Sequence, residues 1–236
     1  MYRGKDIGSK DELIETCHQL LLKGDAESLF SILPHISLLR CRSFLKPLSG
    51  LLGSRVRGKQ IFAAMALGAV ACPEGLIPLA DRFDEPSTRT GRGSRSLQTA
   101  IIVAIGEIGN AQGVPALQKI FAHQEAGDGF TRKRRRVVVS AMGKLLQQDV
   151  KAAPNALQKM LQDEEPGVRA QASLELGTGY WHTPDKVPEE VLEALIHSSQ
   201  DASVEVRMAA CSAIYGLAEV GCSRARGLLE GASVVS

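Results

Sequence analysis

The chain has 236 residues, of which 44% are hydrophobic, 23% are charged and only 4% are aromatic, and its formal net charge is +2. This content suffices for a large core, but no apolar run approaches the roughly 18 residues that a membrane-spanning helix needs. The five cysteines are odd in number and show no Cys-x-x-Cys spacing, and residues 1–15 lack the apolar core of a signal peptide. We therefore expect a cytoplasmic protein with reduced thiols.

The amino-terminal part predicts a pair of helices. Ser9 is a suitable N-cap, and the apolar residues after it have the i, i+3, i+4, i+7 spacing of one helix that ends near Gly24. Asp25 is a suitable cap for a second helix, which Pro34 is expected to stop. Because this pair lies outside the repeat described next, we assign residues 1–43 to an amino-terminal cap that shields one end of the repeat array.

A ten-residue pattern then recurs along the chain. In its clearest form, at residues 168–177, it reads VRAQASLELG, with a basic residue near the start, small residues in the middle and a closing leucine and glycine. The other four versions occupy residues 59–68, 97–106, 134–143 and 206–215. The last residues of the five versions are separated by 38, 37, 34 and 38 positions, an interval typical of helical solenoids.

An apolar segment that usually opens with a proline follows the pattern, as in Val-Pro-Ala-Leu at residues 114–117. Proline suits the first turn of a helix, where its missing N–H would have had no partner. The repeating unit is therefore a first helix and a second helix, and the second helix carries the pattern. In the first regular unit we expect them at residues 44–52 and 55–70. The glycine that closes the pattern, such as Gly68, is expected to end the second helix in a left-handed conformation.

The segment at residues 103–121 (VAIGEIGNAQGVPALQKIF) and the VRAQASLELG run resemble the HEAT-repeat family, particularly its short bacterial and phycobilisome-lyase-type members. The resemblance covers roughly residues 44–230. It implies an all-α fold, a right-handed α-solenoid of about five HEAT-like helical-hairpin repeats in one domain, with residues 231–236 as a short tail. The family contains scaffolds, adaptors and a few enzymes, so this fold does not decide the function.

Two repeats have long polar, glycine-rich loops between their helices, at residues 83–96 and 122–131. Because equivalent loops of a solenoid lie along one edge, we expect these two loops to be neighbours. The carboxy-terminal face lacks an obvious polar cap. We expect a partner, a second copy of the chain or residues outside this sequence to cover it, and the second case would make a homodimer.

Basic residues gather where three consecutive second helices are expected to begin. They are Arg55, Arg57, Lys59, Arg89, Arg92, Arg95, Arg132, Lys133, Arg134, Arg135 and Arg136. Cations at a helix start oppose the helix dipole, which calls for a reason other than folding. We interpret them as an edge that binds an acidic or phosphorylated protein segment, or nucleic acid. The alternative is a solvated loop whose counterions are acidic residues nearby in the sequence. The absence of interleaved aromatic residues argues against nucleic acid.

Two further arginines are expected to have structural roles. Arg169 and Arg207 each follow an aspartate by six residues, Asp163 and Asp201 respectively. This spacing resembles the Asp-to-Arg bridging that ties neighbouring HEAT-like repeats together.

The pair Tyr180 and Trp181 belongs to the only aromatic cluster of the sequence. It is interpreted either as a partner anchor or as a plug over the adjoining helix.

No catalytic or metal-binding pattern occurs. The five histidines lack the spacing of a metal site, and no phosphate-binding loop or nucleophile elbow is present. No histidine is followed by glutamate, which excludes the iron site of HEAT-type deoxyhypusine hydroxylases. HEAT-like alkylpurine DNA glycosylases use a basic cleft with several tryptophans; this chain has the basic character but one tryptophan, which makes that resemblance weak. We therefore expect no catalytic residue, no metal and no cofactor.

The sequence favours a non-catalytic scaffold or adaptor that binds a protein partner through a concave face of second helices and the basic edge. The first alternative is a nucleic-acid-binding, DNA-repair-like HEAT protein that uses the same edge. The second is an accessory protein of the bilin-lyase type, although nothing marks a bilin pocket.

Overall fold

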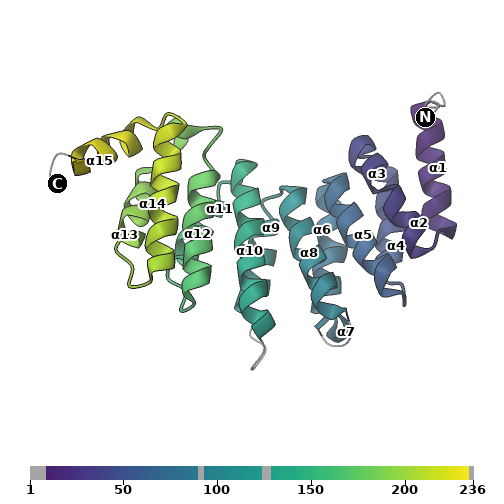
Figure 1. The fold of residues 1–236 in the computed structure, drawn as a ribbon. Coiled ribbons are helices and arrows are strands. Elements are labelled where there is room, and N and C mark those ends of the chain that lie inside the picture. Colours follow the sequence, from purple (N-terminus) through teal and green to yellow (C-terminus); the bar gives the residue numbers. More distant parts are fainter. Residues whose placement is uncertain (1–8, 90–92, 124–128, 234–236) are drawn as a thin grey trace, which may run out of the picture. The chain divides into compact units, whose positions relative to one another are not determined.

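A computed structural model describes residues 9–89, 93–123 and 129–233 (Figure 1). All regular secondary structure in these ranges is helical, which confirms the expected all-α class. None of the helices there is long and apolar enough to cross a membrane. The chain divides into two compact units, Met1–Ile108 (unit 1) and Gly109–Ser236 (unit 2), and each is described by itself.

Unit 1 begins with three helices that precede the regular repeats. Its helices are α1 (Lys10–Lys23), α2 (Ala26–Ser31), α3 (Leu33–Leu39), α4 (Leu45–Leu52), α5 (Arg57–Val70), α6 (Leu76–Asp84), α7 (Pro86–Arg89) and α8 (Ser94–Ile108). Ser9 and Glu12 form a capping box at α1, and Asp25 caps α2 as expected. Pro34 does not stop the helix that Asp25 caps. That helix ends earlier, at Ser31, and Pro34 lies in the first turn of α3 instead.

Helical hairpins make up the rest of unit 1. Helix α4 packs against α5, and α6 packs against α8. The second helices α5 and α8 lie side by side (Figure 1). Their shared core contains Phe62, Leu67 and Ile101, which are fully buried. Alternating first and second helices thus bury one continuous apolar layer, as the repeat pattern predicts.

Unit 2 continues the same alternation. Its helices are α9 (Gly113–Ala122), α10 (Gly129–Gln147), α11 (Ala153–Met160), α12 (Pro166–Thr178), α13 (Glu189–Ser198), α14 (Val204–Glu219) and α15 (Ser223–Ser233). The second helices α10, α12 and α14 contact one another in that order, and the first helices α9, α11 and α13 pack against them. This arrangement confirms the helical-hairpin repeats expected from the sequence.

The expected role of the glycines that close the pattern is wrong. Helix α5 continues past Gly68 to Val70, so this glycine does not end the helix. A Cβ atom on Gly68 would lie 2.8 Å from the Cα atom of Ala104 on the next second helix. A Cβ atom on Gly177 would likewise lie 2.6 Å from the Cβ of Ala213 on α14. These glycines therefore allow neighbouring second helices to approach closely.

The two long loops belong to different units, so their expected proximity stays a prediction. Part of the first forms the short helix α7, and residues 90–92 lie outside the described residues. In the second loop, residues 124–128 also lie outside them.

Candidate functional site

In unit 1 the basic residues lie around the start of α5 and α8. Arg55 is exposed and Lys59 is half-buried. Arg57 donates through Nη1 to Oε1 of Gln60 at 2.8 Å and through Nη2 to the backbone oxygen of Ser87 at 2.9 Å. Arg57 therefore ties α5 to α7. Arg95 is exposed in the first turn of α8.

Arg92 lies outside the described residues, and the backbone of Arg89 is described within α7 without its side chain.

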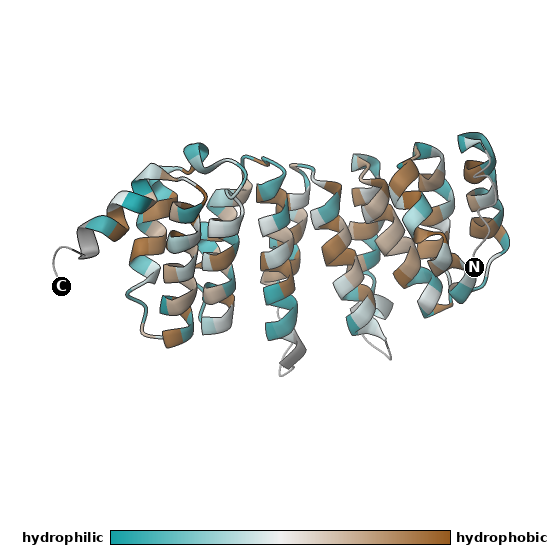
Figure 2. Ribbon diagram, turned by 45° about the horizontal axis from the view of Figure 1, so that its top comes forward, coloured by the Kyte–Doolittle hydropathy of each residue, from teal (hydrophilic) through white to brown (hydrophobic). Residues whose placement is uncertain are grey.

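In unit 2 the basic run forms the second turn of α10, because that helix begins earlier than expected, at Gly129. Figure 2 shows this part of α10 as hydrophilic and the following turns as more hydrophobic. Arg134 is only 1% exposed and donates to the backbone oxygen of His123. Burial at this position means that Arg134 belongs to the interior of the α9–α10 hairpin.

Arg135 and Arg132 reach the loop before α12. Arg135 pairs with Asp163 and with Glu164, the latter at 3.3 Å between Nη1 and Oε1. Its guanidinium carbon also lies 4.7 Å from the centre of the Phe121 ring. Nε of Arg132 lies 3.6 Å from Oε2 of Glu165. Both arginines thus join one repeat to the next.

Lys133 and Arg136 are exposed and have no ion pair among the described residues, whereas Arg132 is 72% exposed but lies near Glu165. Helix periodicity explains part of the division: Lys133 and Arg136 are three residues apart and share a face, and Arg134 lies on another. Treating the five residues as one block missed this separation, which a helical projection of residues 129–147 would have shown.

The exposed side of the second helices of unit 2 will be called the outer row. Its members are Lys133, Arg136 and Ser140 of α10, Leu174 of α12, and Glu205, Met208 and Ser212 of α14, all of them exposed. Ser140, Leu174 and Ser212 occupy equivalent positions of the repeat. A Cβ atom on Gly167 of α12 would lie 3.7 Å from Nη1 of Arg136 and 3.7 Å from Oε1 of Glu205. The side chains of α10 and α14 therefore flank α12 on this face.

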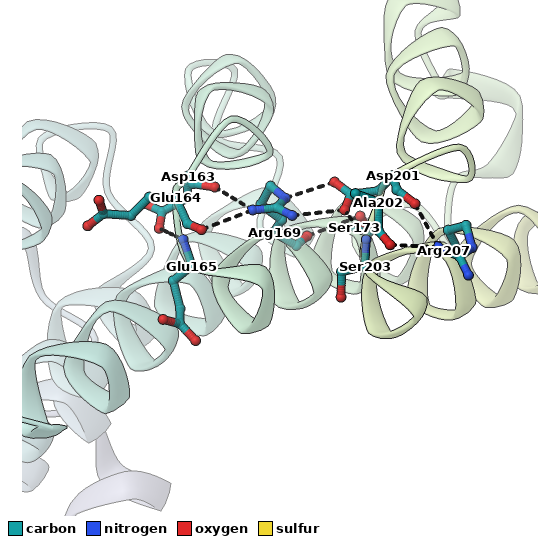
Figure 3. Close-up of polar contacts among 9 residues, drawn as sticks. All are labelled: Asp163, Glu164, Glu165, Arg169, Ser173, Asp201, Ala202, Ser203 and Arg207. Carbon is teal, nitrogen blue, oxygen red and sulfur yellow. Dashed lines mark hydrogen bonds and ion pairs between the residues drawn. The ribbon is translucent and has the colours of Figure 1, made fainter.

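Arg169 and Arg207 form a ladder along one edge of unit 2 (Figure 3). Arg169 makes a two-pronged contact with Asp201 of the next repeat, with Nε–Oδ2 and Nη2–Oδ1 distances of 2.8 Å. Its Nη1 also donates to the backbone oxygen of Asp163 at 2.8 Å. Arg207 repeats only the backbone contacts, to the oxygens of Asp201 and Ala202, both at 2.9 Å.

These contacts shift the ionisation of the pair. The hydrogen bonds from Arg169 hold the pKa of Asp201 below its ordinary value, and the same bonds raise the pKa of Arg169. Both groups are therefore charged at neutral pH, and each stabilises the other.

Tyr180 and Trp181 follow α12 but face different surroundings. Tyr180 is buried, and this burial, together with the negative charge of Asp149, raises its pKa to about 12. Trp181 is 47% exposed, and its Nε1 would lie 3.3 Å from a Cβ atom on Gly216. Only Trp181 is thus placed to contact a partner. Next to Tyr180 lies a cavity of about 310 Å³, lined also by Lys151, His182 and Lys186.

No group of three or more metal-ligating side chains is found among the residues that the structure describes.

Comparison with known proteins gives one family match and several related folds. Residues 191–221, which span α13 and α14, match the HEAT repeat. No curated protein sequence matches the chain. A chain of the CpcE–CpcF complex of phycocyanin lyase from Nostoc sp. PCC7120 has 19% identity and a TM-score of 0.50, covering 72% of this chain and 98% of that one.

Two further structures are similar at lower TM-scores. An engineered protein has 17% identity and a TM-score of 0.47, covering 92% of this chain and 94% of that chain. Human deoxyhypusine hydroxylase has 16% identity and a TM-score of 0.40, covering 89% and 97%. Residues 191–221 thus resemble one HEAT repeat, and the helical hairpins of both units make the chain an all-α repeat protein.

Proposed function

We propose that the protein is a non-catalytic scaffold or adaptor that binds a protein partner on the outer row of unit 2. The observation that carries this proposal is the pairing of cations with exposed apolar groups on one face. Lys133 and Arg136 of α10 are exposed on the face that also carries Leu174 of α12 and Met208 of α14, which is 66% exposed. Large apolar side chains that remain in water next to charged ones are typical of interaction surfaces.

The charge of the outer row favours an acidic or phosphorylated partner segment. Arg132, Arg134 and Arg135 already have acceptors within unit 2. Of the basic run, this leaves Lys133 and Arg136 exposed without an ion pair among the described residues, while the exposed Arg132 lies 3.6 Å from Glu165. The expected basic edge is therefore proposed in a narrower form, with these two residues as its core. Trp181 is a further candidate anchor, since it is half exposed beside α14.

Affinity capture from the native cells tests the proposal. The double variant Lys133→Glu/Arg136→Glu should recover the partner at least about tenfold less well than the unchanged chain, because reversed charges repel an acidic segment. A control with the same change in net charge is Lys23→Glu/Lys159→Glu, at two exposed lysines elsewhere. Equal recovery by the two double variants would contradict binding at the outer row.

Nucleic acid remains the second candidate, since the same two cations could contact phosphate. Fluorescence anisotropy of labelled DNA and RNA over a salt series separates the two. Binding at about 0.15 M salt that Lys133→Glu/Arg136→Glu abolishes would favour nucleic acid. The bilin-lyase alternative rests on likeness of fold alone, and a bound chromophore would be visible as colour.

A further inference from the structure

Helix α14 exposes a face that its counterpart α12 buries. The two helices carry the same pattern 38 residues apart. On α12, Ala170 packs against Val206 and Ala209 of α14, and Gly177 lies against Ala213. The equivalent residues of α14 are Met208, Cys211 and Tyr215; all three are exposed, Met208 by 66% and Tyr215 by 58%. The face of α14 that corresponds to a repeat-to-repeat contact is therefore open.

Helix α15 also exposes residues whose counterparts are buried. Its counterpart is α11, a first helix that lies two repeats, or 72 residues, earlier in the chain. Ala153 of α11 and Ala225 of α15 are both fully buried. In α11 the next inward residues, Ala156 and Leu157, are buried where α10 and α12 pack against this helix. The equivalent residues of α15 are Leu228 and Leu229, which are 39% and 37% exposed. Helix α15 thus occupies the place of a first helix and leaves its contact surface for a second helix open.

Arg207 lacks the carboxylate that its counterpart has. Arg169 bonds to two backbone oxygens of its own loop and to Asp201 of the following repeat. Arg207 makes the equivalent two backbone contacts (Figure 3), but no carboxylate pairs with it in the part of the chain that the structure describes. By analogy with Nε and Nη2 of Arg169, which contact Asp201, the corresponding atoms of Arg207 would meet an acidic residue of a following repeat.

We propose that α14 and α15 form a docking site for one helix of another polypeptide, which carries an aspartate or glutamate just before its first turn. The helix would lie in the position of a further second helix, with its acidic residue on Arg207. Because Met208 and Tyr215 are bulky where α12 has alanine and glycine, the helix should present small side chains to them. Continuity with the α12–α14 interface and the lack of a direct ion pair at Arg207 among the described residues both support this occupant. The site shares Met208 with the outer row, whereas Cys211, Tyr215 and the residues of α15 belong to the docking site alone.

A peptide made from this chain provides a probe. Residues 199–219 contain Asp201 and the small residues Ala209 and Ala213 that face α12 within unit 2. A labelled peptide of this segment, with Cys211→Ser to prevent disulfide formation, is titrated with the whole protein and followed by anisotropy. Saturable binding is expected. Met208→Glu in the protein, and separately Asp201→Asn in the peptide, should each weaken it at least about tenfold.

Two control variants test whether the peptide binds specifically at α14 and α15. Met208 is mostly exposed, so Met208→Glu itself should leave the circular dichroism spectrum unchanged. Ile77→Glu introduces the same charge at an exposed position of α6 and should not affect peptide binding. Lys133→Glu/Arg136→Glu should not affect it either, which separates the outcome from the two cations that the proposed function depends on.

Three results would overturn the proposal. The first is that the peptide does not bind. The second is that its affinity is unchanged by Met208→Glu in the protein or by Asp201→Asn in the peptide. The third is self-association of the whole protein that Met208→Glu abolishes, because it would assign this face to a second copy.

Discussion

Replacing Arg169 by alanine is expected to lower the free energy of unfolding of unit 2 by about 2–3 kcal/mol. The variant loses the two-pronged contact with Asp201 and the bond to the backbone oxygen of Asp163, and it leaves a largely buried carboxylate without its cation. Urea denaturation followed by tryptophan fluorescence measures this directly, because Trp181 is the only tryptophan and lies in unit 2.

Two further variants isolate the contact. Lys159→Ala removes an exposed cation from α11 and should change stability by no more than about 0.5 kcal/mol. Asp201→Asn combined with Arg169→Ala should cost clearly less than the two single changes added together, because both remove the same interaction. Full additivity would show that the pair does not connect the repeats.

The same pair predicts a dependence on pH. The pKa of Asp201 is lower in the folded protein than in the unfolded chain, so its contribution is complete above the ordinary aspartate pKa of about 4. It is lost as the pH falls from there through the folded pKa. The difference in stability between the unchanged protein and Asp201→Asn should therefore shrink in this acid range. A difference that stays constant would contradict the assignment.

Replacing Gly177 by alanine is expected to cost about 1–3 kcal/mol of stability, although alanine is the better helix former. The added methyl group would lie 2.9 Å from the Cα and 2.6 Å from the Cβ of Ala213. Relief requires α12 and α14 to separate, because a backbone atom cannot rotate away. Urea denaturation with the Trp181 signal again provides the measurement.

Gly227 supplies the matched control for that substitution. It also lies within a helix of unit 2, and nothing would come within 4 Å of its added Cβ atom. Gly227→Ala should therefore be neutral or stabilise by up to about 1 kcal/mol. If the two substitutions had the same effect, close approach would not be the reason for glycine at position 177.

The helical hairpins could be predicted from the sequence, because their pattern repeats several times and each copy supports the others. The role of Gly68 and Gly177 could not be predicted. A glycine near the end of an apolar pattern can stop a helix or admit a neighbouring one. Only the position of Ala104 or Ala213 across the interface decides between them.

The candidate site was also hard to predict, because it too depends on contacts between repeats. A run of five basic residues looks uniform in sequence, but on a helix it divides between the interior and the surface. The acceptors of Arg135 and Arg169 come from residues about 30 positions later, so their pairing depends on how the repeats stack. The open faces of α14 and α15 become visible only when equivalent repeats are compared for burial.

The basic run on α10 divides into Arg134 and Arg135, which contact other parts of unit 2, and Lys133 and Arg136, which are exposed. The stability of two double variants tests this division most directly. Arg134→Gln/Arg135→Gln and Lys133→Gln/Arg136→Gln remove the same charge from adjacent positions of one helix. The first should lower the free energy of unfolding by about 2 kcal/mol or more, because it removes the contacts to His123 and Asp163. The second should change it by no more than about 0.5 kcal/mol. Equal losses in the two variants would contradict the assignment of Lys133 and Arg136 to a binding surface.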